Sequence, residues 1–284
     1  MKKKLVVSFS GGRTSGYMTK WLIDNKQDEY EFVIIFANTG QEHEKTLEFI
    51  NNCDKHFGFN TVWVESVVHN GERKGTTHKI VSFETASRNG EPFEEVIKKY
   101  GIPNMAFPHC TRELKLAPIY SYIREIGWSK KQRYTAIGIR NDENRRVRKD
   151  AVDAHIIYPL IDMIPTDKQD VLDWWKEQDF DLGISEHHGN CTWCWKKSIK
   201  KHMMLIDEMP DIFNFPRSME NLYPHNGSHK DKTIPRTFFR GNKSTDALFE
   251  IHKLVGSEDI ANYCNDNGVN TCSESCEMYQ MELI

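Results

Sequence analysis

The stretch Leu5-Val-Val-Ser-Phe-Ser-Gly-Gly-Arg-Thr-Ser-Gly-Tyr-Met18 decides the fold. An apolar run, Leu5–Phe9, leads into a loop of small residues, and a helix start follows directly. Glycines let the backbone approach an anion closely, and a helix start offers converging N–H groups with a partial positive charge. The spacing matches neither the Walker loop nor the dinucleotide fingerprint. The loop predicts a phosphate-binding site, and an ordinary glycine-rich turn is the alternative interpretation.

Composition limits the class of protein. A chain of 284 residues, 38% hydrophobic and 28% charged, fits one large α/β domain or a domain with an appended lobe. The formal net charge of −3 argues against wholesale electrostatic binding to nucleic acid. No apolar run is long enough to predict a membrane span. Seven cysteines without a recognisable secretion signal favour a reducing, cytoplasmic location, in which metal, cluster or redox roles are expected before disulfides.

The first half of the chain alternates between strand-like and helix-like segments. Strands are expected at Leu5–Phe9, Glu31–Ala37, Thr61–Ser66, Tyr134–Ile139 and His155–Leu160. Helices are expected at Ser15–Asn25, Glu42–Phe57, Glu91–Tyr100, Thr111–Ile126 and Asp167–Lys176. This alternation predicts an α/β fold, a mostly parallel twisted sheet with helices on both faces, whose ligands bind at the carboxyl ends of the strands.

Two segments are less regular. The polar stretch His69–Gly90 is interpreted as a long excursion over the site, with a surface loop as the alternative. The tail holds a helix to about Glu208, proline-containing loops over 210–235 and a last helix near Thr245–Leu254. We therefore expect a nucleotide-binding α/β domain over 1–185 and a small cysteine-containing lobe over 186–284.

Five further segments carry chemically active side chains in a fixed order. They are Phe36–Gly40, Pro108–Lys115, Gly138–Glu143, Tyr158–Asp162 and Cys191–Cys194. Together with the S-G-G-x-x-S loop they resemble the phosphoadenosine phosphosulfate (PAPS) reductase family of the PP-loop adenine nucleotide α-hydrolase superfamily. The resemblance covers residues 4–205 and implies that family's Rossmann-like fold.

The resemblance implies that an adenine nucleotide, ATP or PAPS, binds at the glycine loop. The nucleotide-binding residues that it implies are Ser10, Gly11, Gly12, Arg13, Thr14, Ser15, Asn38, Thr39, Gly40, Gly138, Arg140, Glu143 and Arg145. Arg13 and Arg140 are the expected catalytic cations, because a guanidinium offers forked, permanently charged donors to an oxyanion. Mg²⁺ would help to neutralise the phosphates. In the Arg145–Lys149 run, a solvated basic turn is the alternative, most strongly for Arg148 and Lys149.

Three cysteines form a second candidate site. Cys191 and Cys194, spaced C-x-x-C, lie one turn apart as zinc and iron ligands do, and Cys110 lies far upstream. The resemblance implies a [4Fe–4S] cluster on these thiolates, although His109 replaces one cysteine of the pair found in cluster-containing relatives. The fourth ligand is left to His109, Cys272, Cys276 or an exogenous group. A structural zinc ion and free thiols are the alternatives.

Two further motifs carry weaker hypotheses. Relatives use a nucleophilic cysteine near the C-terminus, so Cys272 is a candidate catalytic residue, although Glu274 and Glu277 would oppose a thiolate there. The pair His187-His188 has the chemistry of metal ligands, but a loop pair of this kind is more often unremarkable surface. No site is predicted on it.

The intact glycine loop separates two enzyme hypotheses. Relatives that cleave ATP to AMP and pyrophosphate keep this loop, whereas sulfonucleotide reductases tend to have a degenerate version. The resemblance therefore implies sulfur transfer or ATP-dependent activation, assisted by a cysteine-ligated cluster. The alternatives are reduction of PAPS or adenylyl sulfate to sulfite, and a non-catalytic nucleotide-binding module that acts with a partner. The acceptor, whether nucleic acid, protein or small metabolite, and the oligomeric state stay open.

Overall fold

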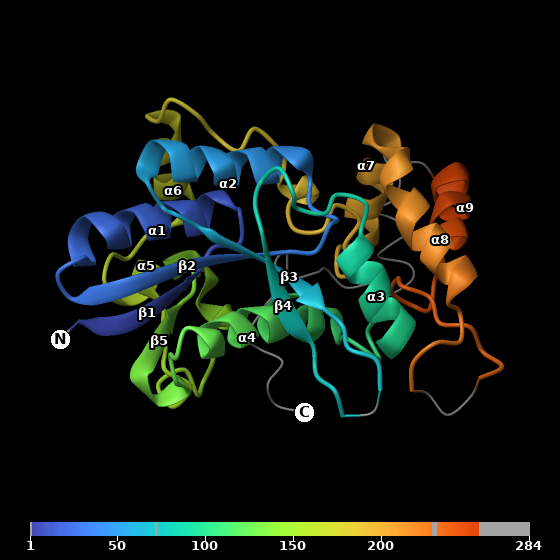
Figure 1. The fold of residues 1–284 in the computed structure, drawn as a ribbon. Coiled ribbons are helices and arrows are strands. Elements are labelled where there is room, and N and C mark those ends of the chain that lie inside the picture. Colours follow the sequence, from blue (N-terminus) through green and yellow to red (C-terminus); the bar gives the residue numbers. More distant parts are fainter. Residues whose placement is uncertain (1, 72, 229–231, 256–284) are drawn as a thin grey trace.

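The centre of the protein is a six-stranded sheet (Figure 1), seen in a computed structural model that describes residues 2–71, 73–228 and 232–255. The strands are β1 (Lys3–Ser8), β2 (Tyr30–Asn38), β3 (Val62–Val67), β4 (Thr77–Val81), β5 (Arg133–Ala136) and β6 (Ile156–Ile157). Their order in space is β4-β3-β2-β1-β5-β6, and every neighbouring pair is parallel except β3 and β4. The predicted mostly parallel α/β fold is confirmed.

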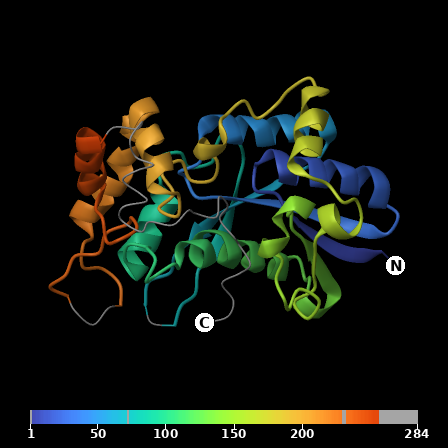
Figure 2. The same ribbon diagram turned by 180° about the vertical axis from the view of Figure 1, so that it is seen from behind.

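Helices cover both faces of this sheet (Figures 1 and 2). One face carries α1 (Arg13–Lys26), α2 (Glu44–Phe57), α5 (Pro159–Asp162) and α6 (Lys168–Lys176), and the other carries α4 (Ala117–Glu125). The structure also contains short helical turns. They are η1 (Arg112–Leu116, π-helical), η2 (Lys130–Gln132), η3 (Asn141–Arg146), η4 (Glu186–His188) and η5 (Pro210–Phe213). None of the helices in the described part of the chain is both long and apolar enough to cross a membrane.

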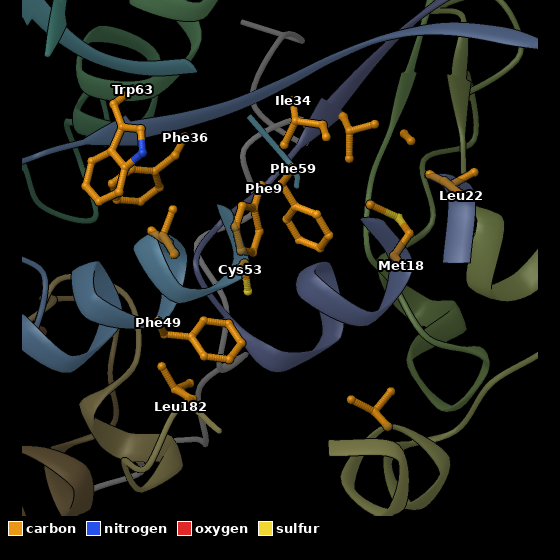
Figure 3. Packing of buried hydrophobic residues seen from close by; sticks show 14 of the residues in the cluster. Phe9, Met18, Leu22, Ile34, Phe36, Phe49, Cys53, Phe59, Trp63 and Leu182 are labelled. Carbon is orange, nitrogen blue, oxygen red and sulfur yellow. The ribbon is translucent and has the colours of Figure 1, made fainter. Parts of the chain in front are cut away.

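Alternate residues of β1 point to opposite faces, as the geometry of a strand requires. Leu5 and Val7 pack with α1 and α2, whereas Val6 packs with α4 on the other side. Figure 3 shows the first of these clusters, in which the rings of Phe9 and Phe59 meet edge to face with centroids 5.5 Å apart. The central strands β1 and β2 are therefore buried on both faces, which fits their continuous apolar runs.

A second group of helices gathers at one end of the sheet (Figure 1). It consists of α3 (Glu91–Tyr100), α7 (Ile199–Glu208), α8 (Asn214–Leu222) and α9 (Thr245–Val255). Their apolar side chains form a separate buried cluster that includes Phe93, Trp193 and Phe213. This cluster draws on residues from both sides of residue 185, so the division of the chain at that point stays a prediction.

Three sequence predictions need correction. The excursion expected at His69–Gly90 contains β4. The side chains of this strand are half exposed or exposed, so its sequence lacks the apolar pattern that predicts a strand. The loops expected over 210–235 contain α8, whose Pro216 sits in the first helical turn, where a missing N–H loses no partner. The strand expected at His155–Leu160 shrinks to the two residues of β6, because Pro159 begins α5.

The approach of α1 to α6 requires glycine at position 16. A Cβ atom on Gly16 would lie 2.8 Å from Cζ2 of Trp175, a residue 1% exposed whose Nε1 donates to the Arg13 carbonyl at 2.9 Å. We expect Gly16→Ala to lower the free energy of unfolding by about 1–2 kcal/mol, because overpacking outweighs the gain in helix propensity. Chemical denaturation measures the change.

The matched control is Gly75→Ala, whose added Cβ meets no described atom within 4 Å. Its free energy of unfolding should stay within about 0.5 kcal/mol of the wild type. A Gly16→Ala protein as stable as the wild type would contradict the packing of α1 on α6.

Candidate functional site

The loop over residues 10–12 connects β1 to α1 at the carboxyl edge of the sheet. Gly11 has a φ of +77°, and a Cβ there would lie 2.7 Å from Cγ2 of Thr46, so both backbone and packing require glycine. The side-chain oxygens of Ser10 and Ser15 lie 3.0 Å apart, and the backbone N–H of Ser10 donates to Ser15 Oγ at 3.2 Å. These bonds fold the loop tightly over the start of α1.

The N-terminus of α1 is suited to an anion. Gly12 occupies the N-cap and has no side chain with which to cap the first N–H groups. The first turn, Arg13–Gly16, contains no acidic residue that would compete for them. Uncapped N–H groups and the helix dipole together attract negative charge.

A cavity of about 320 Å³ opens at this loop. Six basic side chains line it against two acidic ones, Glu143 and Glu186. The basic ones are Arg13, Lys115, Arg140, Arg146, Arg148 and Lys168. Phe36, Ala37 and Ile137 supply an apolar wall. The cavity combines a basic region, in which Arg13, Arg140, Arg146, Arg148 and Lys168 each pair with a carboxylate, with an apolar region. An anionic ligand with a flat apolar part could exchange for those carboxylates and fill both regions.

Nine of the predicted nucleotide-binding residues line this cavity. They are Ser10, Gly11, Gly12, Arg13, Thr14, Ser15, Gly138, Arg140 and Glu143. Asn38, Thr39, Gly40 and Arg145 are not among its described lining residues. Arg145 is exposed. Arg148, for which the sequence most strongly suggests a solvated turn, instead lines the cavity with a side chain that is only 7% exposed. The kinked turn η3 decides which arginines face inward, and residue spacing does not reveal that turn.

The two arginines expected to be catalytic already have partners at the cavity. Arg13 makes a forked ion pair with Asp181, with Nε–Oδ1 at 2.6 Å and Nη2–Oδ2 at 2.7 Å. Arg140 donates from Nε to Asp142 at 2.9 Å and from Nη1 to Thr14 Oγ1 at 3.1 Å. The bond from Arg140 also lowers the pKa of Asp142. Arg140 is therefore held against the glycine loop, where a guanidinium is positioned to meet an oxyanion.

Asn38, the last residue of β2, and Thr39 after it make hydrogen bonds that connect neighbouring segments, and they do not line the cavity. Asn38 Nδ2 donates to the buried Glu65 at 2.7 Å and to the Ser87 carbonyl at 2.8 Å. The Thr39 hydroxyl donates to Glu42 at 2.8 Å. Asn38 thereby joins β2 to β3 and to the segment before α3.

The same turn fixes the C-x-x-C loop. The Gln41 carbonyl accepts from the backbone N–H of Thr192 at 2.9 Å and from its hydroxyl at 2.8 Å. The Gln41 side-chain oxygen accepts from Trp193 Nε1. Thr39 Oγ1 lies 3.3 Å from the sulfur of Cys191. Residues far apart in the sequence thus bring the thiols to the end of β2.

The three predicted metal-binding cysteines belong to one apolar cluster. Cys110 and Cys191 are buried and Cys194 is half-buried. Burial, and then the Glu42 carboxylate, raise the pKa of Cys191 well above its ordinary value. The Cys191 thiol stays protonated at neutral pH unless a metal stabilises its thiolate.

A buried cation lies beside these thiols. Lys197 Nζ donates to the carbonyls of Cys191 at 3.1 Å and Thr192 at 2.6 Å. Burial lowers the pKa of Lys197 to about 8. A cation next to a thiolate ligand set offsets part of its negative charge.

His109, the residue beside Cys110, is neutral and oriented by the backbone. Its Nε2 lies 3.0 Å from the Gly101 carbonyl, so Nε2 carries the proton and Nδ1 the lone pair. Burial lowers the pKa of His109 to about 4. Neutral imidazole is the form that binds metals. The other two candidate ligands, Cys272 and Cys276, lie outside the described residues, as does the catalytic role predicted for Cys272.

Known proteins share this sequence pattern. Residues 4–174 match the family of the phosphoadenosine phosphosulfate reductase domain. The chain is 33% identical to the uncharacterized nin region protein ORF290 of Escherichia phage lambda, over 98% of this chain and 96% of that protein. Two uncharacterized proteins of Methanocaldococcus jannaschii are 28% and 25% identical, over 44% and 89% of this chain and 21% and 55% of their own lengths. The family match spans more than half of the chain and includes the glycine loop, so the protein belongs to the phosphoadenosine phosphosulfate reductase family of the PP-loop superfamily.

Proposed function

We propose that this protein is an enzyme that cleaves ATP to AMP and pyrophosphate in the cavity at the glycine loop, and thereby activates an acceptor for sulfur transfer. The single observation that carries the proposal is the convergence of an uncapped helix N-terminus and six basic side chains on one cavity. A triphosphate supplies the negative charge that this arrangement favours.

The proposed step is a displacement at the α-phosphorus of ATP. An oxygen of the acceptor forms a bond to this phosphorus, and the bond from phosphorus to the oxygen that bridges to the β-phosphate breaks. Pyrophosphate leaves with the electron pair, so negative charge grows on the leaving group, and the acceptor oxygen, which loses its proton to solvent, carries the adenylyl group. A thiol or sulfide of the sulfur donor then bonds to the acceptor atom that carries this oxygen, and the bond from that atom to oxygen breaks, so AMP leaves with the oxygen. In this proposal the backbone N–H groups at the start of α1 and the guanidinium of Arg140, which both border the cavity, stabilise the charge on pyrophosphate.

Arg13 has a different role in this proposal. Its forked pair with Asp181 holds the guanidinium at the rim of the loop, where an arriving phosphate competes for the same donors. Mg²⁺ carried by the nucleotide would neutralise further charge, and Glu143 and Glu186 are the carboxylates of the cavity lining.

The thiols form the second part of the proposal. Cys110, Cys191 and Cys194 would hold a [4Fe–4S] cluster, which supplies sulfur or electrons when bound. The apolar cluster and the nearby Lys197 suit such a group. The ligands of one zinc ion lie about 3.8 Å apart, and among the described residues these thiols do not form a ligand set within 4.8 Å. A single zinc ion on these thiols stays the alternative to the cluster.

Reduction of PAPS or adenylyl sulfate to sulfite is the second candidate, favoured by the family match and by thiols that lie close to the end of β2. We expect the purified protein to form AMP and pyrophosphate from ATP with Mg²⁺, a sulfur donor and an acceptor supplied as nucleic acid, protein or small metabolites. Sulfite formed from PAPS and a dithiol without ATP use would support the second candidate instead. Nucleotide binding with neither product would favour a binding module. Chromatography of the nucleotides distinguishes the three results.

The loop itself is tested by Gly12→Asp. Asp is a favourable N-cap, so the variant should fold, but its carboxylate would occupy the position of a phosphate. We expect the affinity for ATP, measured by calorimetry, to fall at least 100-fold, which is about 2.7 kcal/mol.

Gly75→Asp introduces the same charge in the segment before β4, away from the cavity, where an added Cβ meets no described atom within 4 Å. It should bind ATP like the wild type. Unchanged affinity in Gly12→Asp would show that the nucleotide binds elsewhere.

The cluster is tested by Cys194→Ala in protein purified without oxygen. We expect the iron and sulfide content to fall by at least half, because one thiolate ligand is lost. Cys53→Ala is the control, since Cys53 is buried in the other apolar cluster, among residues of α1, α2 and the sheet. Iron and sulfide that are equal in both variants would exclude Cys194 as a ligand.

A further inference from the structure

Two histidines and a glutamate meet at a place that neither the nucleotide nor the thiol proposal uses. His187 and His188 lie in the turn η4, and Glu208 is the last residue of α7. The Nε2 atom of each histidine lies 2.8 Å from Oε2 of Glu208, and the two ring centroids are 4.3 Å apart. The potential ligand atoms of all three side chains lie within 4.8 Å of one another.

Two ring nitrogens share one oxygen of Glu208, and only one of the two contacts has full hydrogen-bond geometry. His187 Nε2 makes a hydrogen bond with Glu208. His188 Nε2 approaches the same oxygen, yet it is buried and has no hydrogen-bond partner of good geometry among the described residues. An unpaired buried nitrogen destabilises a protein unless something else binds it.

The distances fit a divalent transition-metal ion. Zinc binds histidine nitrogen and carboxylate oxygen at about 2.0–2.2 Å, so its tetrahedral ligands lie about 3.3 Å from one another. Each histidine Nε2 lies 2.8 Å from Glu208 Oε2, and all the potential ligand atoms lie within 4.8 Å of one another. Small side-chain movements would therefore bring them to the spacing of zinc ligands. The Glu208 side chain is 42% exposed, so it can rotate to admit an ion from solvent.

We propose that His187, His188 and Glu208 form a binding site for a divalent transition metal, with zinc as the best match. Two imidazoles and one carboxylate leave a fourth position for water or another ligand. His43 lies nearby, with its ring centroid 5.7 Å from that of His188. Its Nδ1 accepts from the Lys45 backbone N–H at 3.1 Å, so Nε2 carries the proton and His43 is not a fourth ligand.

The position of this site would let a bound ion connect two parts of the fold. His187 and His188 lie between Glu186 and Gly189, both of which line the cavity at the glycine loop. Glu208 ends a helix of the other apolar cluster. A bound ion would therefore tie one wall of the cavity to α7 and stabilise the folded protein.

Cobalt serves as the probe, in titrations of the full chain without a polyhistidine tag. Bound Co²⁺ absorbs in the visible range at any tetrahedral site, whereas a near-ultraviolet charge-transfer band appears only with thiolate ligands. We expect one site without the thiolate band in the wild type. His187→Gln and Glu208→Gln should each weaken this site at least 30-fold.

Asp207→Asn is the matched control, because Asp207 precedes Glu208 and pairs with His252 at 2.6 Å, outside the group of His187, His188 and Glu208. It should bind Co²⁺ like the wild type. Equal binding by the wild type, His187→Gln and Glu208→Gln would overturn the assignment, as would cobalt bound only with the thiolate band.

Thermal unfolding with Zn²⁺ gives a second measurement, which remains informative if the buried His187 variant fails to fold. Zn²⁺ should raise the Tm of the wild type and of Asp207→Asn by more than it raises that of Glu208→Gln. The same increase in all three proteins would overturn the assignment.

Discussion

The hydrogen bonds at the end of β2 and in the turn after it hold the cavity at the glycine loop and the C-x-x-C loop near the same end of this strand. Asn38 ties the turn to Glu65 on β3, and Gln41 ties it to Thr192 and Trp193 in the C-x-x-C loop. These groups are buried, so each lost bond would leave an unsatisfied polar atom in an apolar environment. Phe36 and Ala37, near the end of β2, also line the cavity at the glycine loop. The distance between that cavity and the thiols is therefore fixed by the core and does not depend on a flexible connection.

The parts of the fold that the sequence predicts are those set by neighbouring residues. The apolar run of β1, the glycine with positive φ at position 11 and the start of α1 follow one another within a few residues. Alternating strands and helices then restrict the sheet to a mostly parallel order. The same locality explains why the sequence predicts that residues 10–15 share one site: these residues are contiguous, and the backbone of the loop brings them to one cavity.

What the sequence does not reveal depends on contacts between distant segments. β4 exists because its backbone pairs with β3, and its half-exposed side chains carry little pattern. Whether Arg145 or Arg148 faces the cavity depends on a kink at Glu143. The motif at the end of β2 suggests nucleotide contacts, yet Asn38 is satisfied by Glu65 and Ser87. Glu208 joins the histidine pair across twenty residues of sequence, and spacing gives no sign of that meeting.

The two edge strands of the sheet, β4 and β6, affect how readily copies of the protein aggregate. An open sheet edge offers unpaired backbone groups on which another chain can add a strand. Here β4 runs against its neighbour and carries Lys79, whose ammonium group pairs with Glu65 at 2.9 Å. At the opposite edge β6 is only two residues long and is soon followed by Pro159, which has no N–H to donate. Neither border offers a long, flat, apolar template, so the architecture resists edge-to-edge aggregation at high protein concentration.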